Sequence, residues 1–113
     1  MRIYEYNGTT LPFDIYDVDT LERYENAMIK LGKAEKAIPK DGKQSDIIRA
    51  ECEALRTAFD DILGEGTADQ LFGDRRSMAE LMDAYETLIA TVEEQRLAMQ
   101  TRVAKYSPNR VRK

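Results

Sequence analysis

The clearest hydrophobic pattern lies in the last third of the chain. Between residues 78 and 106 the pattern alternates spacings of four and three, with one polar interruption. Its positions are Met78, Met82, Tyr85, Ile89, Val92, Arg96, Met99, Val103 and Tyr106. Ser77 and Glu80 match a capping box, and Ser107-Pro108 opposes further helix. The pattern therefore predicts a helix over 78–106, about 43 Å long at 1.5 Å per residue.

Two shorter amphipathic segments precede this helix. Asp19 is the predicted N-cap of the first, which begins near Thr20 and ends at Pro39 and Gly42. Its apolar stripe is Leu21, Tyr24, Met28, Leu31 and, after Glu35, Ile38. The second covers about 46–63, and its stripe is Ile48, Cys52, Leu55, Phe59 and Ile62. We expect a short helical turn from Thr67 to Phe72 before the long helix begins.

The first seventeen residues alternate differently and predict a β-hairpin. Asn7-Gly8 is a typical two-residue turn, and the face formed by Leu11, Phe13 and Ile15 must pack on a helix or join the sheet of another subunit. The expected fold is mainly α: an N-terminal β-hairpin followed by a three-helix bundle with a long C-terminal helix. We expect one domain over 1–106, including the hairpin (1–17), and a basic tail over 107–113.

The long helix exceeds what the shorter two can cover. Each of those is about 28 Å long, so the last third of the long helix should project from the bundle. Met99, Val103 and Tyr106 would then present an apolar stripe to a helical partner. Periodicity leaves self-association and binding of another protein equally open. Arg96 could set the register of such packing or extend to solvent.

Charge is divided unevenly along the chain. The net charge is −4, but residues 102–113 hold five basic and no acidic residues. Residues 1–101 hold twelve basic and twenty-one acidic residues, which gives −9. This acidic body disfavours nucleic acid, and Arg110, Arg112 and Lys113 fit an acidic protein surface better. No apolar run approaches the ~20 residues of a membrane span, so a soluble protein without a membrane partner is expected.

The sequence offers little catalytic or metal-binding chemistry. It contains no histidine, and its one cysteine, Cys52, lies inside an apolar stripe, which predicts an inert core thiol. Asp14, Asp17 and Asp19 lack the frame of a calcium loop and are expected to form turns and caps. The acids at Asp60, Asp61, Glu65 and Asp69 are interpreted as solvated surface, and Gly64–Thr67 as a turn. We expect no enzyme, catalytic residue, cofactor or metal site.

Several blocks of the sequence carry a resemblance to a known family. They are Phe13–Asp17, Glu22–Glu25, Ile47–Cys52, Phe59–Thr67, Leu71–Gly73 and Lys105–Arg110. In these blocks, and in the order of its predicted elements, the chain resembles small tail assembly chaperones of tailed phages and prophages of Gram-positive bacteria. None of the blocks encodes a catalytic mechanism, so the resemblance implies a binding role.

The resemblance implies a protein that binds the helical tape-measure protein, keeps it soluble and helps recruit tail-tube subunits. Met99, Val103 and Tyr106 would supply apolar contacts, while Arg110, Arg112 and Lys113 would steer toward an acidic surface. The start of the chain lacks a signal-peptide pattern, so the expected location is the cytoplasm of the infected bacterial host. A structural tail subunit forming rings or a helical array and a nucleic-acid-binding regulator using the basic tail are the alternatives.

Overall fold

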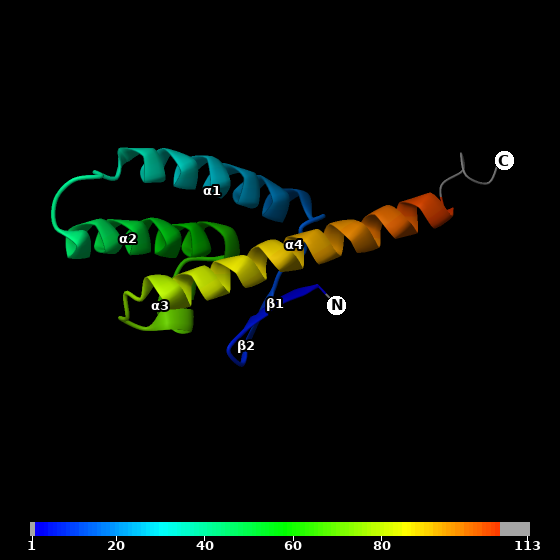
Figure 1. Ribbon diagram of the computed structural model, residues 1–113. Coiled ribbons are helices and arrows are strands. Elements are labelled where there is room, and N and C mark those ends of the chain that lie inside the picture. The colour runs from blue at the N-terminus through cyan, green and yellow to red at the C-terminus, as the bar shows by residue number, and fades with distance from the viewer. Residues whose placement is uncertain (1, 107–113) are drawn as a thin grey trace.

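The computed structural model describes residues 2–106 and has the expected mainly α architecture (Figure 1). An N-terminal hairpin precedes a pair of antiparallel helices, a short helix and a long C-terminal helix. In chain order the elements are β1 (Ile3–Tyr6), β2 (Thr9–Pro12), α1 (Val18–Ala37), α2 (Gln44–Leu63), α3 (Thr67–Phe72) and α4 (Met78–Tyr106). The predicted bounds of the long helix are confirmed. Residues 107–113, the predicted basic tail, lie outside the described residues.

The hairpin forms because its turn sequence accepts positive φ. Asn7 and Gly8 have φ of 50° and 84°, the combination that a type I′ turn requires. The strands pair antiparallel, with Ile3 opposite Pro12 and Tyr6 opposite Thr9. Phe13 and Ile15 follow the second strand and are buried in one core cluster with residues of the helices, and Leu11 is partly buried against it, so the predicted packing of this face on helices is confirmed.

Helix α1 begins earlier than predicted. Asp17, not Asp19, is the N-cap: its carboxylate accepts a hydrogen bond of 3.1 Å from the Thr20 amide. Asp17 has the extended backbone of a cap, whereas Asp19 lies in the first turn, where its charge still favours the helix N-terminus. At the start of α4, Ser77 Oγ accepts from the Glu80 amide at 3.3 Å, which is half of the predicted capping box.

The core joins the hairpin to the helices through aromatic rings. Tyr4, Phe59 and Phe72 are fully buried, and the rings of Phe59 and Phe72 meet edge to face with centroids 5.3 Å apart. Cys52 is buried among apolar residues, as predicted, and burial raises the pKa of its thiol. This thiol therefore favours the protonated form, which is a poor nucleophile.

The buried face of α4 differs from the predicted stripe. Leu81, Ala84, Leu88 and Val92 are buried, whereas Ile89 is 36% exposed and Met78 and Met82 are only partly buried. A stripe with a heptad period drifts by ~20° per heptad around a straight helix of 3.6 residues per turn. The predicted stripe therefore lies off the buried face at Met78 and Met82 and reaches that face only from Val92 onward.

The acids around α3 contribute more structure than predicted. Asp69 is exposed, as predicted, but its carboxylate also lies 2.6 Å from the guanidinium of buried Arg56. Arg56 also donates to the Arg75 carbonyl at 3.4 Å. Asp60 accepts from the Ala68 amide at 2.8 Å, in the first turn of α3. A short helix of six residues is thus stabilised by side chains from α2.

Candidate partner-binding site on the free end of α4

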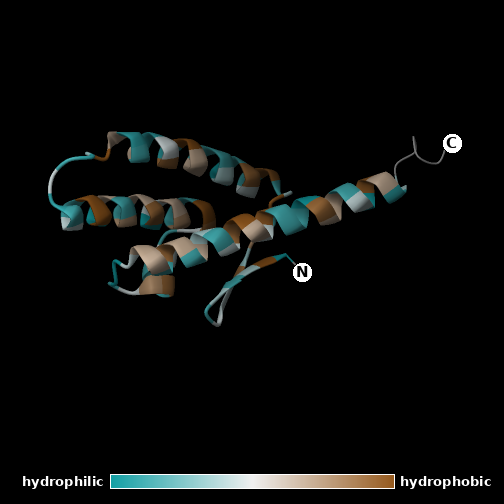
Figure 2. Cartoon of the chain, in the orientation of Figure 1, coloured by the Kyte–Doolittle hydropathy of each residue, from teal (hydrophilic) through white to brown (hydrophobic). Residues whose placement is uncertain are grey.

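The C-terminal end of α4 extends beyond the rest of the molecule (Figure 1). Helical spacing places Met99, Val103 and Tyr106 on the same side of α4 as the buried residues Leu88 and Val92. The apolar face that packs on the body therefore continues past it. Figure 2 shows apolar segments along α4 up to its end. This continuation, rather than an isolated apolar residue, is the reason to treat the free end as a binding site.

The point where α4 leaves the body is fixed by Gln95. Its side-chain amide donates to the Phe13 carbonyl at 2.8 Å and accepts from the Ile15 amide at 2.8 Å. These bonds satisfy backbone groups of the segment between β2 and α1 that have no partner in a sheet. Sequence analysis missed Gln95, because nothing in the local pattern distinguishes it from a surface glutamine.

Exposure of the predicted site residues increases along the helix. Met99 is half-buried and lines a small cavity of about 250 Å³ with Arg2, Tyr16 and Arg102. The expectation that Met99 stands clear of the body is therefore wrong, because the segment around Tyr16 covers part of it. Val103 is 58% exposed and Tyr106 is 71% exposed. These two residues form the unpartnered part of the stripe.

Positive charge surrounds the exposed stripe. Residues 96–106 contain Arg96, Arg102 and Lys105 and no acid. Lys105 Nζ lies 5.5 Å from the centroid of the Tyr106 ring, within the range of a cation–π contact. The free end thus presents an apolar stripe with basic flanks. Arg110, Arg112 and Lys113, the other predicted partner-binding residues, lie outside the described residues.

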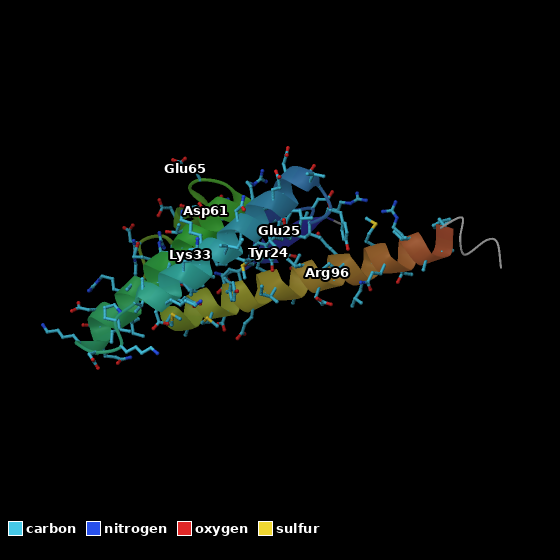
Figure 3. The ribbon with its side chains drawn as sticks, turned by 90° about the horizontal axis from the view of Figure 1, so that it is seen from above. Tyr24, Glu25, Lys33, Asp61, Glu65 and Arg96 are labelled. Atoms are coloured by element: carbon cyan, nitrogen blue, oxygen red, sulfur yellow. The ribbon has the colours of Figure 1, made fainter. Side chains whose placement is uncertain are left out.

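Arg96 lies at the boundary between the body and the free end. It is exposed and faces the region of Tyr24 on α1, as Figure 3 shows. Burial raises the pKa of the Tyr24 hydroxyl, and the positive charge of Arg96 partly opposes this. Of the two predicted roles, extension to solvent describes its exposed side chain.

A second unpartnered apolar surface lies between α1 and α2, and sequence analysis did not predict it. We call it the α1–α2 groove: a hollow of about 460 Å³ lined by residues that include Ala27, Leu31, Ala34, Ala50, Ala54 and Thr57. Small side chains on both helices leave this space open. The recurrence of alanines on α1 and α2 was the available signal, but its meaning depends on which faces meet.

The remaining acids of interest act locally. Asp14 accepts from the Tyr16 amide at 3.0 Å and Asp17 caps α1, as the turn and cap interpretation predicts.

Among residues 2–106 no cluster of three or more side chains suits a metal ion. Nor is any helix in this part of the chain both apolar and long enough for a bilayer.

Comparison with known proteins places the chain in a family without adding an activity. No curated protein and no solved structure matches it. One family matches residues 7–113, from the hairpin turn to the last residue, and its description is that of a family of unknown function. Because the match spans almost the whole chain, the protein belongs to this family, DUF6673.

Proposed function

We propose that this protein is a non-enzymatic phage tail assembly chaperone that binds the tape-measure protein and helps recruit tail-tube subunits. The observation that carries the binding role is the continuation of the buried face of α4 beyond the body, at Val103 and Tyr106. The resemblance of the sequence to tail assembly chaperones supplies the identity of the partner.

The free end of α4 can bind a helix whose apolar stripe is flanked by acidic residues. An exposed apolar stripe at spacings of three and four residues packs against a similar stripe on another helix. Arg102 lies beside Val103 and Lys105 beside Tyr106 on the helix surface, and both would face acidic residues of that partner. Unassembled tape-measure protein presents long apolar helical stripes, and covering them keeps such a protein in solution.

Co-expression tests this proposal. A phage tape-measure protein produced together with this chain should be recovered in the soluble fraction, in complex with the wild-type chain. The double variant Val103→Ser, Tyr106→Ser should lose the complex, whereas Leu97→Ser should retain it. Leu97 is a matched control because it is also exposed on the free end but lies on another side of α4. Equal solubility with and without the chain would contradict the proposal.

Mass spectrometry of purified particles separates a chaperone from a structural tail subunit. A chaperone leaves before the particle is complete and should be nearly absent from it. Recovery of the chain in amounts comparable with the tail-tube protein would instead assign it to the tail. The result does not depend on how the chain binds, so it tests the role independently of the α4 variants.

A further inference from the structure

The free end of α4 and the α1–α2 groove are apolar surfaces of the same chain, and they lie on parts of the molecule that cannot meet. The residues of α2 that line the groove, among them Ala50, Ala54 and Thr57, lie on the side of that helix opposite Cys52, Leu55 and Phe59. The latter belong to the core against which α4 packs. The groove therefore opens away from α4, and Figure 1 shows the free end pointing away from the loop between α1 and α2.

The two surfaces also carry opposite charge. The free end holds Arg96, Arg102 and Lys105 and no acid within residues 96–106. The groove is lined by Lys30, Glu53 and Asp61, and an adjoining hollow that shares Ile38 and Pro39 with it is lined by Glu35, Lys40 and Glu51. Within the groove, Asp61 is paired with Lys30 at 3.2 Å and Glu53 with Arg76 at 2.7 Å. The negative charge on this side of the α1–α2 pair therefore comes from the adjoining hollow, where Glu35 and Glu51 stand against Lys40 and give a net charge of −1.

Two copies of the chain could pair in two ways, and the charges on the contacting surfaces favour one of them. Two free ends packed on each other would bring six basic side chains of the described residues together, three from each copy. A free end seated in the groove of another copy would instead place these basic groups beside acids and bury apolar surface on both. Opposite charge therefore favours the head-to-tail contact over the symmetric one.

We propose that the α1–α2 groove receives the free end of α4 of a second copy of this chain. Val103 and Tyr106 would fill the space that the alanines leave open, with Arg102 toward Glu35 or Glu51 of the adjoining hollow. Because the two contacting surfaces differ, the contact repeats from copy to copy and gives a ring or an open chain. This goes beyond the proposed function, since it concerns the protein in the absence of any partner.

The size of the contact sets its strength. Residues 96–106 extend about 16 Å at 1.5 Å per residue, which makes the interface smaller than those of stable complexes. Association should therefore be weak and reversible, with a dissociation constant on the order of 10–100 μM. A tape-measure helix with a longer apolar stripe would displace the second copy of the chain.

Sedimentation of the purified full-length chain over about 10–500 μM tests the proposal. We expect association that increases with concentration and weakens as salt rises from about 50 to about 500 mM. Ala54→Phe, which fills the groove, and Val103→Ser, Tyr106→Ser, which removes the apolar contacts, should each be monomeric. Ala90→Phe, at an exposed position of α4, is the matched control and should associate like the wild type.

Mixing the two monomeric variants gives the sharpest result. Each retains one intact surface, so a one-to-one mixture should form a heterodimer and no larger species. Thr57→Arg, at an exposed position in the groove, replaces Ala54→Phe if that variant unfolds. A wild-type chain that stays monomeric over the whole range would overturn the proposal. So would an Ala54→Phe or Thr57→Arg variant that still self-associates, or association that strengthens with salt, which indicates pairing of free ends.

Discussion

The two halves of α4 present the same side of one helix to different surroundings. In the first half, the hairpin and α2 pack on this side of α4, and Leu81, Ala84 and Leu88 are buried. In the second half, Val103 and Tyr106 continue that side without a covering element. A hydrophobic period therefore identifies a face of a helix, whereas what covers that face depends on how far the neighbouring elements reach.

Leu88→Ala should give the largest loss. Leu88 is 1% exposed, and truncating a buried leucine to alanine lowers the free energy of unfolding by about 2–5 kcal/mol. Leu97→Ala, the same change in the exposed half, should alter it by less than about 0.5 kcal/mol. Urea denaturation measures both. Similar losses at the two positions would mean that the free half is packed in solution.

Gln95→Ala should have an intermediate effect, because it removes the hydrogen bonds at the boundary between the halves. Losing both bonds to the Phe13 carbonyl and the Ile15 amide should cost about 1–3 kcal/mol of unfolding free energy. The Ile15 amide should also exchange its hydrogen faster. Gln100→Ala, on the exposed half, is the control. An equal loss of unfolding free energy at Gln100 would show that the hydrogen bonds of Gln95 do not stabilise the fold.

Tyr4→Phe should cost about 1 kcal/mol at neutral pH, since the Tyr4 hydroxyl donates to the Ala84 carbonyl at 2.8 Å. Burial also raises the pKa of Tyr4 well above its ordinary value. Above pH of about 10 the unfolded chain loses the tyrosine proton first, so the stability of the wild type should fall as pH rises. Burial raises the pKa of Tyr24 and Tyr85 as well, so Tyr4→Phe should reduce this slope without abolishing it. An unchanged slope would contradict the burial of the hydroxyl.

Ending the chain at Arg102 should have the smallest effect on stability. The removed part includes Val103 and Tyr106, which are largely exposed, so the free energy of unfolding should change by less than about 0.5 kcal/mol. The same truncation should abolish binding of the tape-measure protein. Thermal unfolding followed by circular dichroism measures the first outcome and co-purification the second. A large loss of stability would show that the last turn of α4 packs on the body.

Local signals determined most of the fold. The bounds of α4 follow from Ser77 at its start and Ser107-Pro108 after its end, and the hairpin turn follows from Asn7-Gly8. The N-cap of α1 was harder to predict, because Asp17 and Asp19 have the same capping chemistry two residues apart. Only the backbone conformation and the bond to the Thr20 amide distinguish them.

Features that depend on packing between distant segments were not predictable. The ion pair of Arg56 with Asp69 requires α3 to fold back on α2, and the bonds of Gln95 join residues eighty or more positions apart. For the candidate site, Val103 and Tyr106 were predicted because helix length alone exposes them. The α1–α2 groove was not predicted. Alanine favours helix formation, and its small side chain leaves a groove only where two helices lie side by side.

Helix α4 runs from residue 78 to 106 without a glycine or proline, so nothing in its sequence introduces a joint between the packed half and the free half. A molecule held at the tip would therefore sit at a set height and angle relative to the hairpin.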